Sequence, residues 1–352
     1  MPTAFDPVDL GKRRLANRVA MAPMSRSRSY DPLALPNPSA ARYYRQRASA
    51  GFIVTEGIQP SPEARGYPAT PGLHLDAQVR AWHEVTDAVH EAGGTIYAQL
   101  MHAGRIGHPS LLPAGVTPVG PSPIAADAKV FTPAGLRPCV TPRELTEDDI
   151  VRTIADFAVA ATNAVTAGFD GVEIHGANGF LLHQFLSDNA NTRADGWADG
   201  IRLAVAVAGA VAASIGPERV GFQISPGNPH NDIVETRTHR VYPSLVSELD
   251  ELDLAYLHVS EGADQALTAR LRSRWSSVFV LNPHTPNGRT GPDHLALIED
   301  GAADVISFGK LFLANPDLPR RLALGGPFTE PDPSTFYGGD DRGYVDYPAL
   351  PD

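Results

Sequence analysis

The chain has 352 residues, of which 43% are hydrophobic and 20% charged, so it can bury a substantial core and is too apolar to be disordered. Its formal net charge of −11 argues against a nucleic acid or an anionic membrane as the main partner, because both require clustered Lys and Arg. The single cysteine, Cys139, excludes an internal disulfide, and with neither a leader sequence nor a bilayer-length apolar run we expect a soluble, cytoplasmic monomer or homodimer.

Eight short β-branched runs alternate with longer helical patterns along the chain. Continuous apolar strands suit a parallel sheet that is covered on both faces, and eight of them separated by helices are what a closed barrel requires. We therefore predict an α/β fold, a single (β/α)8 TIM barrel over residues 1–352. The predicted strands are residues 18–22, 51–55, 95–100, 171–174, 220–225, 254–259, 277–281 and 304–308.

The helical patterns carry start and stop signals. Thr146 and the three acidic residues after it open an apolar-periodic run that continues to Ala167 and is closed by Gly168. Residues 203–215 form a second, Ala- and Val-rich helical run, ended by Gly216.

The segment 103–141, after the third predicted strand, does not fit the repeat because it is long and rich in Pro and Gly. A long loop after a barrel strand lies over the active-site face and is usually functional. We interpret it as a lid with a hairpin around Val130 and Phe131; a loosely packed surface insertion is the alternative.

The stretch 171–180 runs from an apolar strand into small and polar residues, so His175 and Asn178 are predicted at the rim of the sheet. Together they can donate two hydrogen bonds to one oxygen, which polarises a carbonyl group. A histidine in an ordinary loop is the plainer alternative.

The other predicted strands also end in polar residues, and these would gather at one end of the barrel. The set contains hydrogen-bonding groups and little charge, without zinc-ligand spacing, a nucleophile elbow or paired catalytic carboxylates, so no metal is expected. Such a site suits a bound cofactor that performs the chemistry. Its members are Ser25, Glu56, Gly57, Gln99, Met101, His102, His175, Asn178, Gln223, Ser225, His258, Ser260, Asn282, Gly309 and Lys310.

Loops after the seventh and eighth strands form the usual phosphate site of these barrels. Asn282 begins the first of these loops, which runs to Gly291, while Gly309 and Lys310 begin the second. A Gly-Lys pair in an ordinary turn would give the same sequence.

Seven ordered motifs together resemble the Old Yellow Enzyme family of FMN-dependent ene-reductases, and most closely its actinobacterial alkene reductase type. They extend from near the N-terminus to residue 339, so the resemblance covers nearly the whole chain. The motifs are NRVAMAPMSR (17–26), YYRQRA (43–48), TEG (55–57), GY (66–67), QLMHAGR (99–105), EIHGANGFLLHQFL (173–186) and FYGG (336–339).

The resemblance implies a role for each matching residue. His175 and Asn178 would hold the substrate's carbonyl oxygen, Tyr337 would line the substrate side, and NAD(P)H would reduce the flavin. The residues that would bind FMN non-covalently are Pro23, Met24, Ser25, Gly57, Gln99, Gln223, Asn282, Gly309 and Lys310.

Three departures from the family pattern bear on activity. Phe180 stands where the family has a tyrosine that protonates the substrate's α-carbon, and Gln223 replaces an arginine beside the flavin N1. A loop just after Trp197 is shortened to residues 198–200. We interpret the three changes as clustered around one pocket.

The predicted function is NAD(P)H-dependent reduction of the C=C bond of a small-molecule α,β-unsaturated carbonyl compound. Because Phe180 cannot donate a proton, a redox-neutral isomerase or dehydrogenase-like enzyme is the first alternative. A flavin-free binding protein is the second, motivated by Gln223 and the shortened loop.

Overall fold

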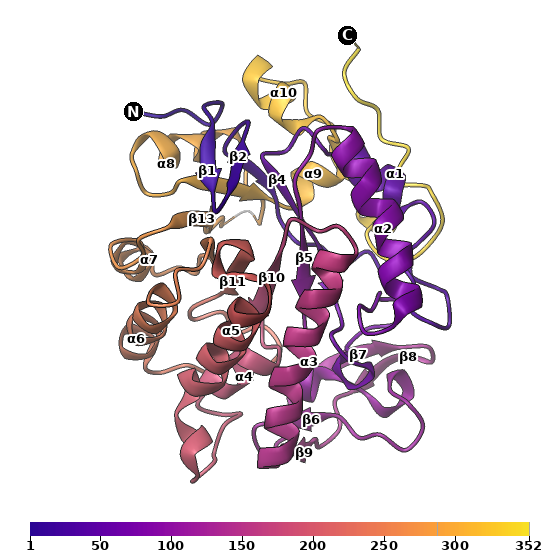
Figure 1. Ribbon diagram of the computed structural model, residues 1–352, viewed down its shortest axis with the longest axis vertical. Helices are drawn as coiled ribbons and strands as arrows, with labels where there is room; N and C mark the ends of the chain where they lie inside the picture. The colour runs from indigo at the N-terminus through magenta and orange to yellow at the C-terminus, as the bar shows by residue number, and fades with distance from the viewer. Residues whose placement is uncertain (287, 352) are drawn as a thin grey trace.

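The computed structural model describes residues 1–286 and 288–351, and eight parallel strands close into a barrel at its centre (Figure 1). The predicted (β/α)8 barrel is confirmed, with its strands in chain order around the barrel. Its strands are β3 (Val19–Met21), β4 (Phe52–Ile58), β5 (Ile96–Leu100), β10 (Gly171–Gly176), β11 (Val220–Ile224), β12 (Tyr256–Ser260), β13 (Val278–Asn282) and β14 (Val305–Phe308), and β14 pairs with β3.

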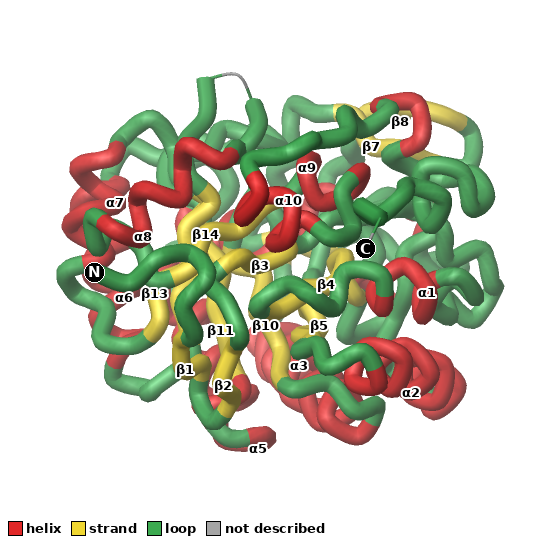
Figure 2. The backbone as a smooth tube through the Cα atoms, turned by 90° about the horizontal axis from the view of Figure 1, so that it is seen from above, coloured by secondary structure: helices red, strands yellow, loops and turns green. Residues whose placement is uncertain are grey.

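Helices surround the barrel, as the view from above shows (Figure 2). The helices α3 and α5 pack against each other outside β10 and β11. The helices are α1 (Ala40–Arg45), α2 (Asp76–Glu91), α3 (Glu147–Thr166), α4 (Leu181–Leu186), α5 (Gly200–Ile215), α6 (Thr238–Asp250), α7 (Gln265–Arg272), α8 (Ala296–Glu299), α9 (Lys310–Ala314) and α10 (Leu318–Leu324). Among the described residues, no helix combines the length and the apolar character that crossing a bilayer requires.

The helix ends follow from capping. Thr146 and Asp149 form the reciprocal capping box of α3, as the sequence predicted. The helix α5 begins three residues before the predicted run because the Asp199 carboxylate accepts the Ile201 N–H at 3.4 Å and caps it.

The barrel interior is apolar at its N-terminal end. Phe52, Tyr97 and Tyr256 point inward and contact one another edge to face or tilted, with ring centroids 5.3–5.7 Å apart. Leu10 and Leu15, from the hairpin of β1 (Val8–Leu10) and β2 (Arg13–Leu15), close this end. The polar side chains that point into the barrel therefore lie toward its C-terminal end.

The predicted lid is a packed segment rather than a loose insertion. Its hairpin, β7 (Lys129–Thr132) and β8 (Gly135–Pro138), is the one predicted around Val130 and Phe131. Ile106, Ala126 and Val130 are buried in one apolar cluster with Phe180. In Figure 1 the hairpin lies at the end of the molecule opposite β1 and β2.

Arg26 and Arg28 are buried, so they do not form a basic surface patch. The Arg26 guanidinium donates to the carbonyls of Thr335 and Gly343, at 3.2 and 2.9 Å. Arg28 donates to the Thr335 carbonyl at 3.0 Å and stacks 4.7 Å from the Tyr344 ring centroid. The two arginines therefore hold the C-terminal segment against the residues that follow β3.

Candidate active site

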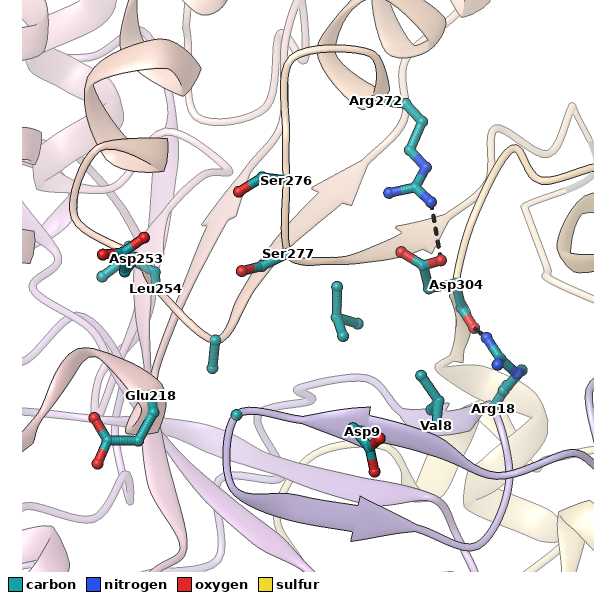
Figure 3. A pocket seen from close by; sticks show the side chains of 13 residues that line it. Val8, Asp9, Arg18, Glu218, Asp253, Leu254, Arg272, Ser276, Ser277 and Asp304 are labelled. Atoms are coloured by element: carbon teal, nitrogen blue, oxygen red, sulfur yellow. Dashed lines mark hydrogen bonds and ion pairs between the residues drawn. The ribbon is translucent and has the colours of Figure 1, made fainter.

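The two ends of the barrel differ in chemistry. At the N-terminal end, a hollow of about 470 Å³ is lined by Arg18, Glu218, Asp253 and Asp304, beside the β1–β2 hairpin (Figure 3). Active sites of these barrels form at the other end, where the strands deliver their last residues. The predicted site residues lie on or just after the eight barrel strands, except Tyr337, which lies in the C-terminal segment.

His175, on β10, is a neutral hydrogen-bond donor. Its Nδ1 accepts the Ala177 N–H at 3.2 Å, so the ring proton of the neutral imidazole lies on Nε2. Burial, helped by the nearby His183 and His258, lowers the pKa of His175 to about 3. None of the described residues accepts a hydrogen bond from Nε2, which is thus available to a ligand.

Asn178 follows in the left-handed conformation, with φ of 54°, which asparagine tolerates better than most residues. Two successive hydrogen bonds through Asn228 fix its side-chain orientation. Asn228 Oδ1 accepts the His230 N–H at 3.0 Å, so Asn228 Nδ2 must donate to Asn178 Oδ1, at 2.9 Å. The Asn178 amide nitrogen is therefore a donor with no partner among the described residues.

Gln99 and Gln223 flank β10 from β5 and β11. Gln99 Nε2 lies 2.9 Å from Glu173 Oε1 and 2.9 Å from Gln223 Oε1. Glu173 is fully buried on β10, between the two strands. The sequence placed both glutamines at the site but did not show that they contact each other directly or that Gln99 also contacts a buried carboxylate.

The predicted cofactor residues Pro23, Met24 and Ser25 are half-buried just after β3. Gly57 lies within β4, not beyond it, because the β4–β5 register shifts between Val54 and Gly57. A Cβ at Gly57 would lie 2.8 Å from Met101 Sδ, so a larger residue there would have to displace the Met101 side chain.

The predicted phosphate residues lie at the ends of β13 and β14. Lys310 is exposed, and its Nζ donates to the Gly288 carbonyl at 3.0 Å. Asn282 donates to the Ser307 carbonyl at 2.9 Å and joins the two strands, next to Gly309. Residue 287, in the same predicted loop, lies outside the described residues.

Phe180 is 6% exposed and separates two aromatic groups. Its ring contacts His175 edge to face at 4.9 Å and Tyr67 at 6.1 Å, centroid to centroid. Burial raises the pKa of Tyr67 to about 12, so its hydroxyl stays protonated at neutral pH. Tyr337, predicted to line the substrate side, is 68% exposed.

The shortened loop after Trp197 does not contact the other two departures from the family pattern, Phe180 and Gln223. Trp197 is buried in the outer core and stacks with Arg202, whose guanidinium carbon lies 4.1 Å from the indole centroid. Arg193, in the same segment, donates to the carbonyls of Pro121 and Leu145 in and beside the lid. Among the described contacts, residues 191–199 reach the lid, α4 and α5 but none of the predicted site residues.

Glu56 is a buried acid in the β4 bulge. Its Oε2 accepts the Arg26 N–H at 3.3 Å, yet burial outweighs this and raises its pKa from 4.5 to about 7. Between these two pH values the folded chain holds a proton that the unfolded chain has lost. The free energy of unfolding therefore falls as the pH rises from about 4.5 to 7.

Glu56→Gln should remove this loss. A pKa shift of this size lowers the free energy of unfolding by about 3 kcal/mol between pH 4.5 and 8. Thermal unfolding at both pH values should show a clearly smaller pH-dependent decrease in the variant than in the wild type. The exposed Glu84→Gln, on α2, is the matched control, and an unchanged pH dependence in Glu56→Gln would contradict the assignment.

Asn228, Glu173 and Tyr67 are site residues whose importance the sequence did not show. Glu173 and Tyr67 lay inside recognised motifs without a role of their own, and Asn228 lay outside every motif. Within the part of the chain that the structure describes, no group of three or more His, Cys, Asp or Glu side chains could hold a metal ion.

Comparison with known proteins identifies the family. Residues 3–327 match the model of the NADH:flavin oxidoreductase / NADH oxidase family, whose flavin is FMN. The chain belongs to this family. It is an FMN-dependent oxidoreductase that uses a nicotinamide nucleotide as reductant, as the sequence predicted.

Relatives and solved structures agree over nearly the whole chain. Putative 12-oxophytodienoate reductase 3 from Oryza sativa subsp. japonica is 38% identical, over 98% of this chain and 92% of the relative. The flavin oxidoreductase hxnT from Emericella nidulans is 37% identical, over 98% and 97%. An Old Yellow Enzyme homologue from Zymomonas mobilis has a TM-score of 0.94 and 39% identity, covering 99% and 100%. Morphinone reductase in complex with tetrahydroNAD has a TM-score of 0.94 and 40% identity, covering 100% and 98%.

The residues present fit FMN. The pyrimidine edge of a flavin alternates hydrogen-bond acceptors with one N–H donor. Gln99 Oε1 and Gln223 Nε2 are an acceptor and a donor with no partner among the described residues, and the half-buried Ser25 adds a hydroxyl. These side chains would hold the ring, and Gly309 and Lys310 would lie toward the phosphate.

Proposed function

We propose that this flavin oxidoreductase reduces the C=C bond of α,β-unsaturated carbonyl compounds with NAD(P)H. The observation that carries the proposal is the pair of free donors, His175 Nε2 and Asn178 Nδ2, whose orientations their own neighbours determine. The family relatives named as reductases of 12-oxophytodienoate and as morphinone reductase support the reductive direction.

The two donors, His175 Nε2 and Asn178 Nδ2, determine what the protein itself contributes to catalysis. Two donors aimed at one carbonyl oxygen withdraw electron density from the β-carbon and stabilise the negative charge that develops on the oxygen. Since His175 stays neutral, it donates without adding a full charge to a buried site. FMN, when bound, supplies the hydride. The lid residues that pack on Phe180 exclude water from this region.

The test uses purified holoprotein with NADPH and 2-cyclohexenone under anaerobic conditions. The expected result is one saturated ketone formed per NADPH consumed. NADPH oxidation that leaves the enone unchanged would overturn the proposal, and so would a protein that stays colourless after FMN is added.

Phe180 favours a second candidate, a redox-neutral reaction on the same carbonyl. The apolar ring beside His175 cannot supply the proton that completes reduction. Isomerisation of an enone without net consumption of NADPH would support this candidate. Family membership with an FMN cofactor argues against the flavin-free binding protein.

Asn228→Asp should invert the Asn178 amide. A carboxylate at residue 228 can only accept, so Asn178 would turn its nitrogen toward it and present an oxygen to the substrate. Losing one donor to the carbonyl oxygen should lower kcat/KM for enone reduction by about 10²-fold.

Asn228→Ala is the matched control, because it removes the two hydrogen bonds through Asn228 without reversing the amide. Its loss should be clearly smaller than that of Asn228→Asp, and both variants should retain FMN. Equal losses in the two variants would show that the Asn178 orientation is not what Asn228 controls.

A further inference from the structure

A buried carboxylate lies beneath the predicted flavin-facing residues, and no basic side chain contacts it among the described residues except His258. Glu173 is 0% exposed. Its Oε2 accepts from Tyr256 Oη at 3.1 Å and from His258 Nδ1 at 2.9 Å, and its Oε1 accepts from Gln99 at 2.9 Å. Three donors thus hold it in one orientation.

This carboxylate decides which way the Gln99 amide points. Tyr256 and His258 both donate to Glu173 Oε2, so the carboxyl group acts as an acceptor and the Gln99 group facing it is the NH₂. The second N–H of that group goes to Gln223 Oε1 at 2.9 Å. Both Gln99 protons are then used, and its oxygen is the atom that remains for a ligand.

The orientation of the Gln99 amide in turn determines the orientation of the Gln223 amide. Because Gln223 accepts through its oxygen, its own NH₂ is turned away from Gln99. Gln223 lies on β11 opposite His175, in register with it, so the donor lies in the row of residues next to the predicted carbonyl clamp. A neutral amide can therefore donate where the family pattern has an arginine.

We propose that Glu173 is a positioning residue that sets the polarity of the Gln99–Gln223 pair, so that the pair presents one acceptor and one donor to the pyrimidine edge of FMN. The inference rests on the family's FMN cofactor and does not depend on the proposed enone substrate.

The test measures the dissociation constant of FMN for apoprotein, from the quenching of flavin fluorescence, and the midpoint potential of the holoprotein. Glu173→Gln should raise the dissociation constant at least tenfold and shift the potential to a more negative value, since a donor to the reduced anionic ring is lost. Tyr256→Phe removes a hydrogen bond to the same carboxylate but leaves Gln99 in place, and its dissociation constant should stay within about twofold of wild type.

A double-mutant cycle with Gln99→Leu separates positioning from general stability. Without Gln99 the carboxylate has no route to Gln223, so Glu173→Gln should change FMN binding less than threefold in that background. Equal effects of Glu173→Gln in both backgrounds would overturn the proposal.

If Glu173→Gln does not fold, Gln223→Glu tests the same polarity with Glu173 intact. This variant replaces the donor by an acceptor and should weaken FMN binding at least tenfold; unchanged binding would overturn the proposal. Wild-type protein that binds FMN but fails to reduce enones would sink the proposed function alone.

Discussion

His175→Ala should lower kcat/KM for enone reduction by about 10²- to 10³-fold while leaving the protein yellow. The loss corresponds to removing one preorganised donor from a dry site. Flavin binding should persist because the described side-chain contacts of His175 are with Ala177 and Phe180, and not with the side chains of the Gln99–Gln223 pair. Steady-state kinetics and the flavin absorption spectrum give both results.

The pH profile provides a second check on His175. Its pKa of about 3 lies below the working range, so the donor state should not change between pH 5 and 9. Any ionisation seen in kcat/KM over that range must come from another group. His83→Ala, at an exposed position on α2, is the matched control and should leave kcat/KM unchanged. A titration in the wild type that disappears in His175→Ala would contradict the neutral donor.

The barrel could be predicted from the sequence because it depends on local patterns. Each apolar run became a strand, and the capping box at Thr146 began a helix where expected. His175 and Asn178 could be placed at the rim of the barrel for the same reason, since a residue at the end of a barrel strand lies at the active-site end wherever the rest of the chain goes.

What the sequence did not show depends on contacts between distant segments. The orientation of Asn178 is fixed by Asn228, and that of Gln99 by Glu173, across 50 and 74 residues. Propensity and periodicity carry no information about which amide atom faces which neighbour. Arg26 is a further example, because its guanidinium is buried against a segment more than 300 residues away.

The same limit explains the third departure from the family pattern. Trp197 lies close to the motif around His175 in sequence, but its segment contacts the lid and α5. Phe180 contacts His175, and Gln223 lies opposite it in the β10–β11 register, so these are the two predicted departures that adjoin His175.

Phe180→Tyr should raise the rate of net enone reduction by at least about tenfold, and general acid catalysis sets an upper range of 10²- to 10⁴-fold. The phenyl ring already contacts His175 at 4.9 Å, so the substitution adds a hydroxyl to a ring that is in place. The neighbouring cluster contains Met101 and Ile106, which can adjust to one added oxygen. Saturated product formed per NADPH, followed by gas chromatography, measures the effect.

Tyr67 provides the comparison that makes this result interpretable. Its ring contacts the other side of Phe180 at 6.1 Å, and its hydroxyl is protonated at neutral pH. If water protonates the substrate in the wild type, Tyr67→Phe should leave the reduction rate within about twofold, and Phe180→Tyr should show its full gain in either background. A large loss in Tyr67→Phe that Phe180→Tyr restores would instead identify Tyr67 as the proton source. No gain from Phe180→Tyr in either background would show that proton delivery does not limit this enzyme, and the redox-neutral alternative would lose the observation that favours it.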